Sequence, residues 1–213
     1  MKTKFKLYGI LFLLAVSTVG YSQEIKSLLG NGSIHTSGGY GALTNKFTKI
    51  GGHYANMAGV YGGWYVNHKF MIGVSGAAVT NDIPVPAKYS AIPFENLSYE
   101  YGQCGLMTEY VLGSNRAFHV GFQLFSGAGF TTQYNRNEGD YHNDDAFNNA
   151  KARDTNWFFV AEPGVNVEVN VFKWMRFCPG ISYRKAYGSD GVGMKDSDVD
   201  GAAYNVSLKF GRF

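Results

Sequence analysis

Three carboxylates near the end of the chain have a spacing that could hold a metal ion. Asp196, Asp198 and Asp200 occupy alternate positions and are followed by Gly201. Oxygen ligands at alternate positions before a flexible glycine suit a hard cation such as Ca²⁺. The twelfth position of an EF-hand loop, which takes a bidentate Glu, would be Ser207 in this sequence. The spacing therefore predicts either a partial calcium site or an acidic, hydrated loop, and no other cofactor is expected.

Histidine is the second residue type that could do chemistry, as the base of a Ser-His-acid arrangement. His119 follows a predicted tight turn, His53 and His142 lie in predicted connections, and His35 lies near the start of the first predicted strand. No recognisable nucleophile motif stands beside any of them. We therefore expect a protein without enzymatic activity.

β-strands must position these groups, because apolar and polar residues alternate along the chain with a period of two. Eight segments of about ten residues, the length that a tilted strand needs to cross a bilayer, show this alternation. They lie around residues 34–44, 59–66, 70–75, 97–112, 118–124, 161–171, 175–184 and 204–211. The first and the fourth have mixed parity, and a bulge near Gly102 would restore the alternation of the fourth.

Short and long connections alternate strictly between these segments. Three connections have the length of hairpin turns: 67–69, 113–116 and 172–174. The other four are long and polar: 45–56, 81–96, 134–156 and 189–200. In an up-and-down barrel, this order places both termini and all tight turns at one end and every long loop at the other. The pattern predicts an all-β fold, an eight-stranded antiparallel up-and-down transmembrane β-barrel over residues 23–213.

A secreted β-sandwich is the alternative fold, because its strands would also alternate. Aromatic residues favour the barrel, since they flank the short turns as an interfacial girdle does: Trp64, Phe70, Phe172 and Trp174.

Charged residues at the polar positions of these strands would face the interior of the barrel. They are Glu162, Glu168, Arg176, Arg184 and Lys209, together with His119. An eight-stranded barrel is just wide enough to be filled by side chains, and an unpaired buried charge is too costly to keep. The sequence therefore predicts a salt-bridged interior that holds the barrel rigid. A narrow polar path for ions is the alternative.

Residues 1–22 are predicted to be a cleaved signal peptide. Three lysines precede an uncharged run from Leu7 to Val19, and small residues precede Gln23. Without those three lysines the chain holds 16 Lys and Arg against 16 Asp and Glu, so it is formally neutral. A neutral chain without a basic cluster cannot bind nucleic acid by counterion release, and no nucleic-acid partner is expected.

The chain resembles the small bacterial outer-membrane β-barrels of the OmpA and OmpX group. The resemblance rests on the leader, the eight alternating segments, the three short turns, the four long loops and the closing segment from Ser207 to Phe213. The likeness extends over the whole chain after the leader. One departure is Phe213, which is out of step with Phe210, whereas the terminal Phe of the group shares the parity of the apolar face. The resemblance implies a Gram-negative outer-membrane location, with the tight turns in the periplasm and the long loops facing outward.

We therefore expect a non-enzymatic outer-membrane barrel with a structural or loop-mediated binding or adhesion role, because long and dissimilar loops on a uniform scaffold carry function. The expected partners are outer-membrane lipid, lipopolysaccharide and a protein bound through the long extracellular loops. A narrow porin-like channel is the first alternative, and a lipid-modifying outer-membrane enzyme is the second.

Overall fold

The computed structural model describes residues 36–67, 69–91, 96–113, 116–135 and 153–213. All described residues except Thr36 belong to one compact unit, Ser37–Phe213. The predicted signal peptide of residues 1–22 lies outside the described residues, as do His35 and His142.

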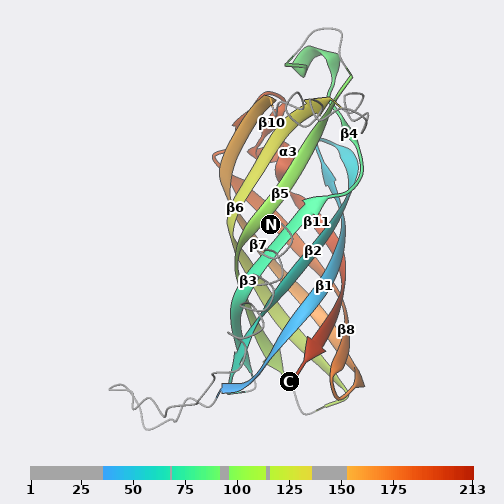
Figure 1. The fold of residues 1–213 in the computed structure, drawn as a ribbon, viewed down its shortest axis with the longest axis vertical. Coiled ribbons are helices and arrows are strands. Elements are labelled where there is room, and N and C mark those ends of the chain that lie inside the picture. Colours follow the sequence, from blue (N-terminus) through green and yellow to red (C-terminus); the bar gives the residue numbers. More distant parts are fainter. Residues whose placement is uncertain (1–35, 68, 92–95, 114–115, 136–152) are drawn as a thin grey trace, which may run out of the picture. The chain divides into compact units, whose positions relative to one another are not determined.

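Eight antiparallel strands form the wall of a closed barrel (Figure 1). They are β1 (Thr36–Ile50), β2 (His53–Val66), β3 (Phe70–Val79), β5 (Leu97–Leu112), β6 (Phe118–Asn135), β7 (Arg153–Phe172), β8 (Met175–Tyr187) and β11 (Gly201–Gly211). The wall closes on itself because β1 pairs with β11 and β3 pairs with β5. The predicted eight-stranded up-and-down barrel is confirmed.

The two ends of the barrel differ in their connections. The end that we call the turn end carries the connections 67–69, 113–117 and 173–174 and the C-terminus. The opposite end, called the loop end, carries short elements between the wall strands: β4 (Ile83–Pro84), the 3-10 helix η2 (Ala87–Tyr89), β9 (Asp190–Gly191), β10 (Met194–Lys195) and α3 (Asp196–Val199). In Figure 1, β4, β10 and α3 lie at the top and the C-terminus at the bottom. Within the described residues, no helix is long and apolar enough to cross a membrane.

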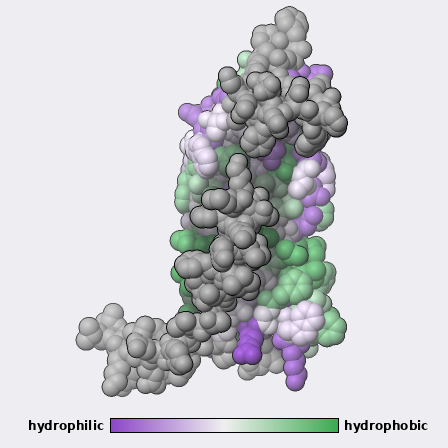
Figure 2. Space-filling model, in the orientation of Figure 1, coloured by the Kyte–Doolittle hydropathy of each residue, from purple (hydrophilic) through white to green (hydrophobic). Residues whose placement is uncertain are grey.

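Side chains alternate between the two faces of the wall, because successive residues of a strand point to opposite sides. On β7, Val165 and Val167 are exposed on the outer face, whereas Glu162 and Glu168 are buried inside. Figure 2 shows hydrophobic residues gathered on the middle of the visible wall, with hydrophilic residues above and below them. In a closed wall the backbone N–H and C=O groups pair between neighbouring strands, and the outer face of this wall is apolar. Both features suit a lipid bilayer.

The predicted long connection over residues 45–56 is wrong. β1 continues to Ile50, only Gly51 and Gly52 follow, and β2 begins at His53. Both glycines have positive φ values, 57° and 79°, the left-handed conformation that a tight two-residue hairpin requires.

The polar residues of this stretch suggested a loop because their partners lie far away in the sequence. The Lys46 ammonium donates to Glu162 Oε1 at 2.7 Å, and the Thr48 hydroxyl donates to the Ala202 carbonyl at 2.8 Å. These side chains point into the barrel, and the alternation continues outside with the exposed Phe47. The first strand is therefore longer than predicted.

The bulge predicted near Gly102 is also wrong. β5 pairs with β6 without a register shift, from Leu97 opposite Asn135 to Leu112 opposite Val120. The mixed parity of this strand has another cause, because its inward face combines apolar and polar side chains: Tyr99, Tyr101, Gln103, Met107 and Glu109.

Candidate functional site

Buried charges fill the half of the lumen that is nearer the turn end. Lys209 on β11 donates to Glu109 Oε2 at 2.5 Å and also binds Glu168 on β7. The hydroxyl of Tyr65 donates to the other oxygen of Glu109 at 2.8 Å. All three charged side chains are fully buried. The buried ammonium group is therefore paired with two carboxylates, and removing either partner would leave an uncompensated buried charge.

Glu168 is the centre of this group of charges. Besides Lys209 it contacts His119 Nε2 at 2.9 Å, and it accepts a hydrogen bond from the Arg176 guanidinium at 3.1 Å. These partners come from β6, β8 and β11, so one carboxylate joins four strands across the barrel. Glu109, His119, Glu168, Arg176 and Lys209 are called the ionic cluster below.

The C-terminal Phe213 packs inside the turn end of the barrel. Its ring lies 5.7 Å from the ring of Tyr40 between centroids, and the guanidinium carbon of Arg176 lies 3.8 Å from its centroid. This position explains why Phe213 is out of step with Phe210, since the two side chains lie on opposite faces of the wall. The cation–π contact adds to the filling of this end.

A second polar group lies farther toward the loop end and is centred on Glu162. Besides Lys46, the Ser182 hydroxyl donates to its Oε1 at 2.6 Å and the Gln103 amide to its Oε2 at 2.9 Å. The Tyr101 hydroxyl in turn donates to Gln103 Oε1 at 2.6 Å. Both oxygens of this buried carboxylate are therefore satisfied, as a buried charge requires.

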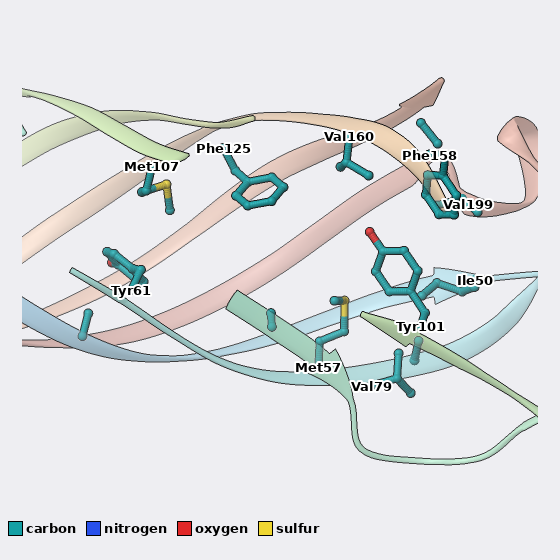
Figure 3. Close-up of a cluster of buried hydrophobic side chains, with 14 of the residues drawn as sticks. Ile50, Met57, Tyr61, Val79, Tyr101, Met107, Phe125, Phe158, Val160 and Val199 are labelled. Carbon is teal, nitrogen blue, oxygen red and sulfur yellow. The ribbon is translucent and has the colours of Figure 1, made fainter. Parts of the chain in front are cut away.

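Apolar side chains fill the loop-end part of the lumen. Figure 3 shows Phe158 and Val160 of β7 facing Ile50, Met57 and Tyr101 from other strands. All five are buried. This packing leaves the loop end filled by side chains, because the interior of a small barrel holds little more than they occupy.

The connection between β8 and β11, residues 188–200, folds over this apolar part and is called the cap. Met194 and Val199 of the cap are buried against it. The cap also bonds to other connections, since the Gly51 amide donates to the Asp198 carbonyl at 2.7 Å. The Tyr99 hydroxyl donates to the Val192 carbonyl at 2.7 Å.

Arg184 ties the cap to the barrel from inside. Its Nε donates to the Val199 carbonyl at 2.8 Å, and its Nη2 donates to the Lys49 carbonyl at 3.1 Å. Its guanidinium carbon lies 4.9 Å from the centroid of the Tyr101 ring. This buried cation is therefore bound by carbonyl groups and an aromatic face, which link β8, the cap and the end of β1.

The three carboxylates of the predicted calcium site have separate hydrogen-bond partners. Asp196 accepts from the Ser189 amide at 2.6 Å, and Asp198 accepts from the Lys195 amide at 3.0 Å. Asp200 binds the Lys185 ammonium and accepts from the Ala186 amide at 2.7 Å. Among the described residues, no three His, Cys, Asp or Glu side chains are grouped as a metal site needs. These contacts connect the three carboxylates to the fold of the cap, and calcium binding at Asp196, Asp198 and Asp200 stays a prediction.

The structure places all six residues of the predicted polar interior inside the barrel. Five of them belong to two clusters, with Glu162 at the centre of the second polar group and His119, Glu168, Arg176 and Lys209 in the ionic cluster, while Arg184 binds the cap. Two further charged residues of the interior, Lys46 and Glu109, are absent from the predicted set. The predicted connection 45–56 includes Lys46, and Glu109 lies on the strand of mixed parity, although it continues the odd-numbered series that includes Gln103.

The fold and the site together define a class of protein. A closed antiparallel barrel with a lipid-compatible outer face and charge-paired interior is the architecture of transmembrane β-barrels in outer membranes. The protein is an outer-membrane β-barrel protein. In this class short turns face the periplasm and the longer connections face outward.

Comparison with solved structures finds the same fold. Neisserial surface protein A aligns with a TM-score of 0.57 and 8% identity over 81% of this chain and 95% of its own. A major outer membrane protein from Thermus thermophilus aligns with a TM-score of 0.51 and 7% identity over 81% and 99%. Ail, the attachment invasion locus protein of Yersinia pestis, aligns with a TM-score of 0.48 and 9% identity over 83% and 99%.

At these identities the likeness is one of fold. The predicted resemblance to small outer-membrane barrels is confirmed at that level. No protein-family model matches the chain. No curated protein matches it either.

Proposed function

We propose that this protein is a non-enzymatic outer-membrane barrel that acts through its loop end, in a structural or binding role, on a scaffold that does not conduct. The observation that carries the proposal is the filling of the lumen at both ends. The ionic cluster and Phe213 occupy the turn end, and the cap packs over apolar side chains at the loop end. A barrel filled in this way supports a rigid outer surface better than it supports transport.

The outer surface of the cap is the part that could meet a partner. Val192 is 46% exposed in the cap, and Lys195 and Asp190 beside it are exposed as well. Lys88 of η2, from another connection, adds an exposed cation at the same end. Ordered loops on a rigid scaffold are where binding residues concentrate. Lipopolysaccharide and a protein are the two partner classes that we propose for this surface.

Site-specific photocrosslinking tests the binding role. A photoreactive residue replaces Val192 in the cap or, as the matched control, Val171 on the wall near the turn end, which is also 46% exposed. After irradiation of intact outer membranes, we expect a discrete adduct at position 192 that is absent at position 171. Protease digestion then tells a protein adduct from lipopolysaccharide. Identical adducts at both positions, or none at position 192, would contradict loop-mediated binding.

A narrow channel remains the second candidate because of one observation in the middle of the lumen. The side-chain amide of Asn205 and the Oδ1 atom of Asn166 are buried without a hydrogen-bond partner among the described residues. Such groups favour a hydrated chamber, because buried polar atoms usually bind water when no protein group is near. Planar-bilayer recording separates the two functions. We expect no steady conductance, and a stable open level from the purified protein would favour the channel.

The geometry around His119 supports a protein without catalysis. Its Nε2 contacts Glu168, and its Nδ1 lies 3.3 Å from the Arg116 carbonyl, so both ring nitrogens are engaged by a carboxylate and a carbonyl group. A lipid acyl-transfer or deacylation assay on the purified protein tests this proposal. Activity that disappears in His119→Gln would overturn it.

A further inference from the structure

The seam between β7 and β8 is interrupted where each strand contains a proline. Within these two strands the pairing stops at Glu162 and Pro163 and again at Val167 and Glu168, although the register is the same on both sides. That register places Pro163 opposite Tyr183, and Val167 opposite Pro179. Proline has no N–H to give to the ladder, so it weakens a pairing in the middle of a sheet.

A hollow of about 560 Å³ lies on the outer face of the wall over the first of these interruptions. Two outward rows of side chains border it, and the register between neighbouring strands defines them. One row consists of large residues: Phe122, Val165, Ile181 and Tyr204. In the other row, the smaller Pro163 and Ala202 stand on either side of Tyr183. The hollow exists because Pro163 and Ala202 do not fill the space between the larger side chains.

The chemistry of this hollow is apolar. Gln123 and Ser182 also line it, but the Gln123 oxygen accepts from Asn166 at 2.8 Å and the Ser182 hydroxyl donates to Glu162. With these groups bound inside the barrel, the hollow offers contact to carbon atoms. Its volume lies in the range of about 300–1,000 Å³ that is usual for small-molecule sites.

We propose that this seam hollow is a binding site for one hydrocarbon chain of a membrane lipid, held there in preference to the rest of the wall. The hollow is continuous with the outward apolar face, where Ile181 is 58% and Tyr204 is 68% exposed, so the bilayer is its neighbour. A chain lying in a concave site contacts wall atoms on several sides, and dispersion energy grows with the number of such contacts. The inference is independent of what the cap binds.

The same wall offers an internal comparison. A second hollow of about 760 Å³ lies over β1, β2 and β3, and its lining includes six glycines, among them Gly41, Gly62 and Gly73. The pairing of β2 with β3 is continuous through this region. Val60, Trp64, Val74 and Phe210 border it, so the two hollows differ in their floors, which are glycine backbone here and the Pro163 and Ala202 side chains in the seam hollow. A lipid chain over glycine backbone meets fewer side-chain atoms, and we expect it to be held less tightly than in the seam hollow.

Photolabelling with a lipid that carries a diazirine in its acyl chain tests the proposal. The full-length protein is reconstituted into vesicles that contain this lipid, irradiated and mapped by mass spectrometry. We expect labelling of Ile181 and Tyr183 to exceed that of the comparably exposed Val60 and Val74 by about tenfold, which corresponds to a tenfold higher local occupancy.

A filling substitution provides the decisive comparison. Ala202→Phe places a ring in the seam hollow, whereas the matched control Ala78→Phe places the same ring on an exposed position of β3 that borders neither hollow. We expect the first variant to abolish the excess labelling and the second to leave it intact. Heat-modifiable gel mobility verifies that both variants fold. Uniform labelling around the wall, or unchanged labelling in Ala202→Phe, would overturn the proposal.

Discussion

The two halves of the lumen are filled in different ways. Near the turn end, charged side chains of the wall strands meet one another, and Glu168 joins His119, Arg176 and Lys209. Near the loop end, apolar side chains of the wall meet a segment that is not part of the wall, the cap with Met194 and Val199. The turn-end half is completed by the strands and Phe213, whereas the loop-end half needs a connection to close it.

This difference separates the stability of the barrel from the properties of its outer surface. The buried charges of the ionic cluster, which come from five strands, must keep their partners, because each one left alone is costly. The cap is held by apolar packing and by carbonyl groups that bind Arg184, contacts that depend less on the identity of its exposed residues. The outer face of the cap can therefore vary in sequence without disturbing the wall, which is what a binding surface requires.

The largest effect is expected in the ionic cluster. Glu168→Gln keeps the shape of the side chain but removes the negative charge that Arg176 and Lys209 share. Because it leaves buried cations without full compensation, we expect a loss of about 3–5 kcal/mol in the free energy of unfolding. Urea unfolding from lipid vesicles measures the change. The control is Glu100→Gln, a half-buried carboxylate on the outward face of β5, for which we expect a change within about 0.5 kcal/mol.

Equal losses in these two variants would contradict the assignment of Glu168 to a buried network.

A smaller loss is expected when a cavity is opened in the apolar half. Met57 is fully buried below the cap, and Met57→Ala removes most of its side chain. Truncation of a buried Met costs about 2–5 kcal/mol, in part because the cavity does not collapse fully. The same unfolding experiment provides the measurement, with Leu106→Ala on the outer face as the control. If the lumen near Met57 were water-filled, the two substitutions would have similar effects.

A loss of cap contacts is expected from Arg184→Met, which keeps much of the volume of the side chain. The Val199 and Lys49 carbonyls then lose their donor inside the barrel, at a cost of about 1–3 kcal/mol. Amide hydrogen exchange should become faster at Gly51, whose amide binds the cap, and remain slow in the middle of β11. Arg116→Met, at an exposed arginine of the turn end, is the control. Unchanged exchange at Gly51 would show that Arg184 does not hold the cap.

The same comparison explains which parts of the structure could be predicted from the sequence. The strands that carry the ionic cluster were found readily, because on β7 and β11 polar residues face inward and apolar residues face lipid. β5 has Tyr101 and Met107 on its inward face, so its two faces differ little in polarity and the sequence pattern predicts a bulge that the strand does not have. On β1, local pattern predicts a loop at the inward Lys46, because the partner that holds this residue inside the barrel is 116 positions away in the sequence.

The cap could not be derived from local pattern. Asp196, Asp198 and Asp200 have the spacing of a cation site, but backbone amides and Lys185 satisfy them in the folded chain. Those donors are brought near by the fold of the connection, and no periodicity indicates them. Val199 is fully buried, but it lies between Asp198 and Asp200, and these flanking acidic residues predict a solvated loop.

The smallest expected effect is the difference in unfolding free energy between two Val→Ala substitutions on the inner and outer faces of β7. Val160 of β7 is fully buried under the cap, and Val167 of the same strand is 47% exposed to lipid. Both Val→Ala substitutions lose the transfer free energy of the removed carbon atoms, about 0.8 kcal/mol for each buried CH₂. Only Val160→Ala leaves a cavity, because lipid chains can move in where Val167 was shortened. We therefore expect Val160→Ala to cost about 1 kcal/mol more than Val167→Ala in urea unfolding from vesicles. A lumen that opened to water at the level of Val160 would remove this difference, since water would enter the space that the substitution creates.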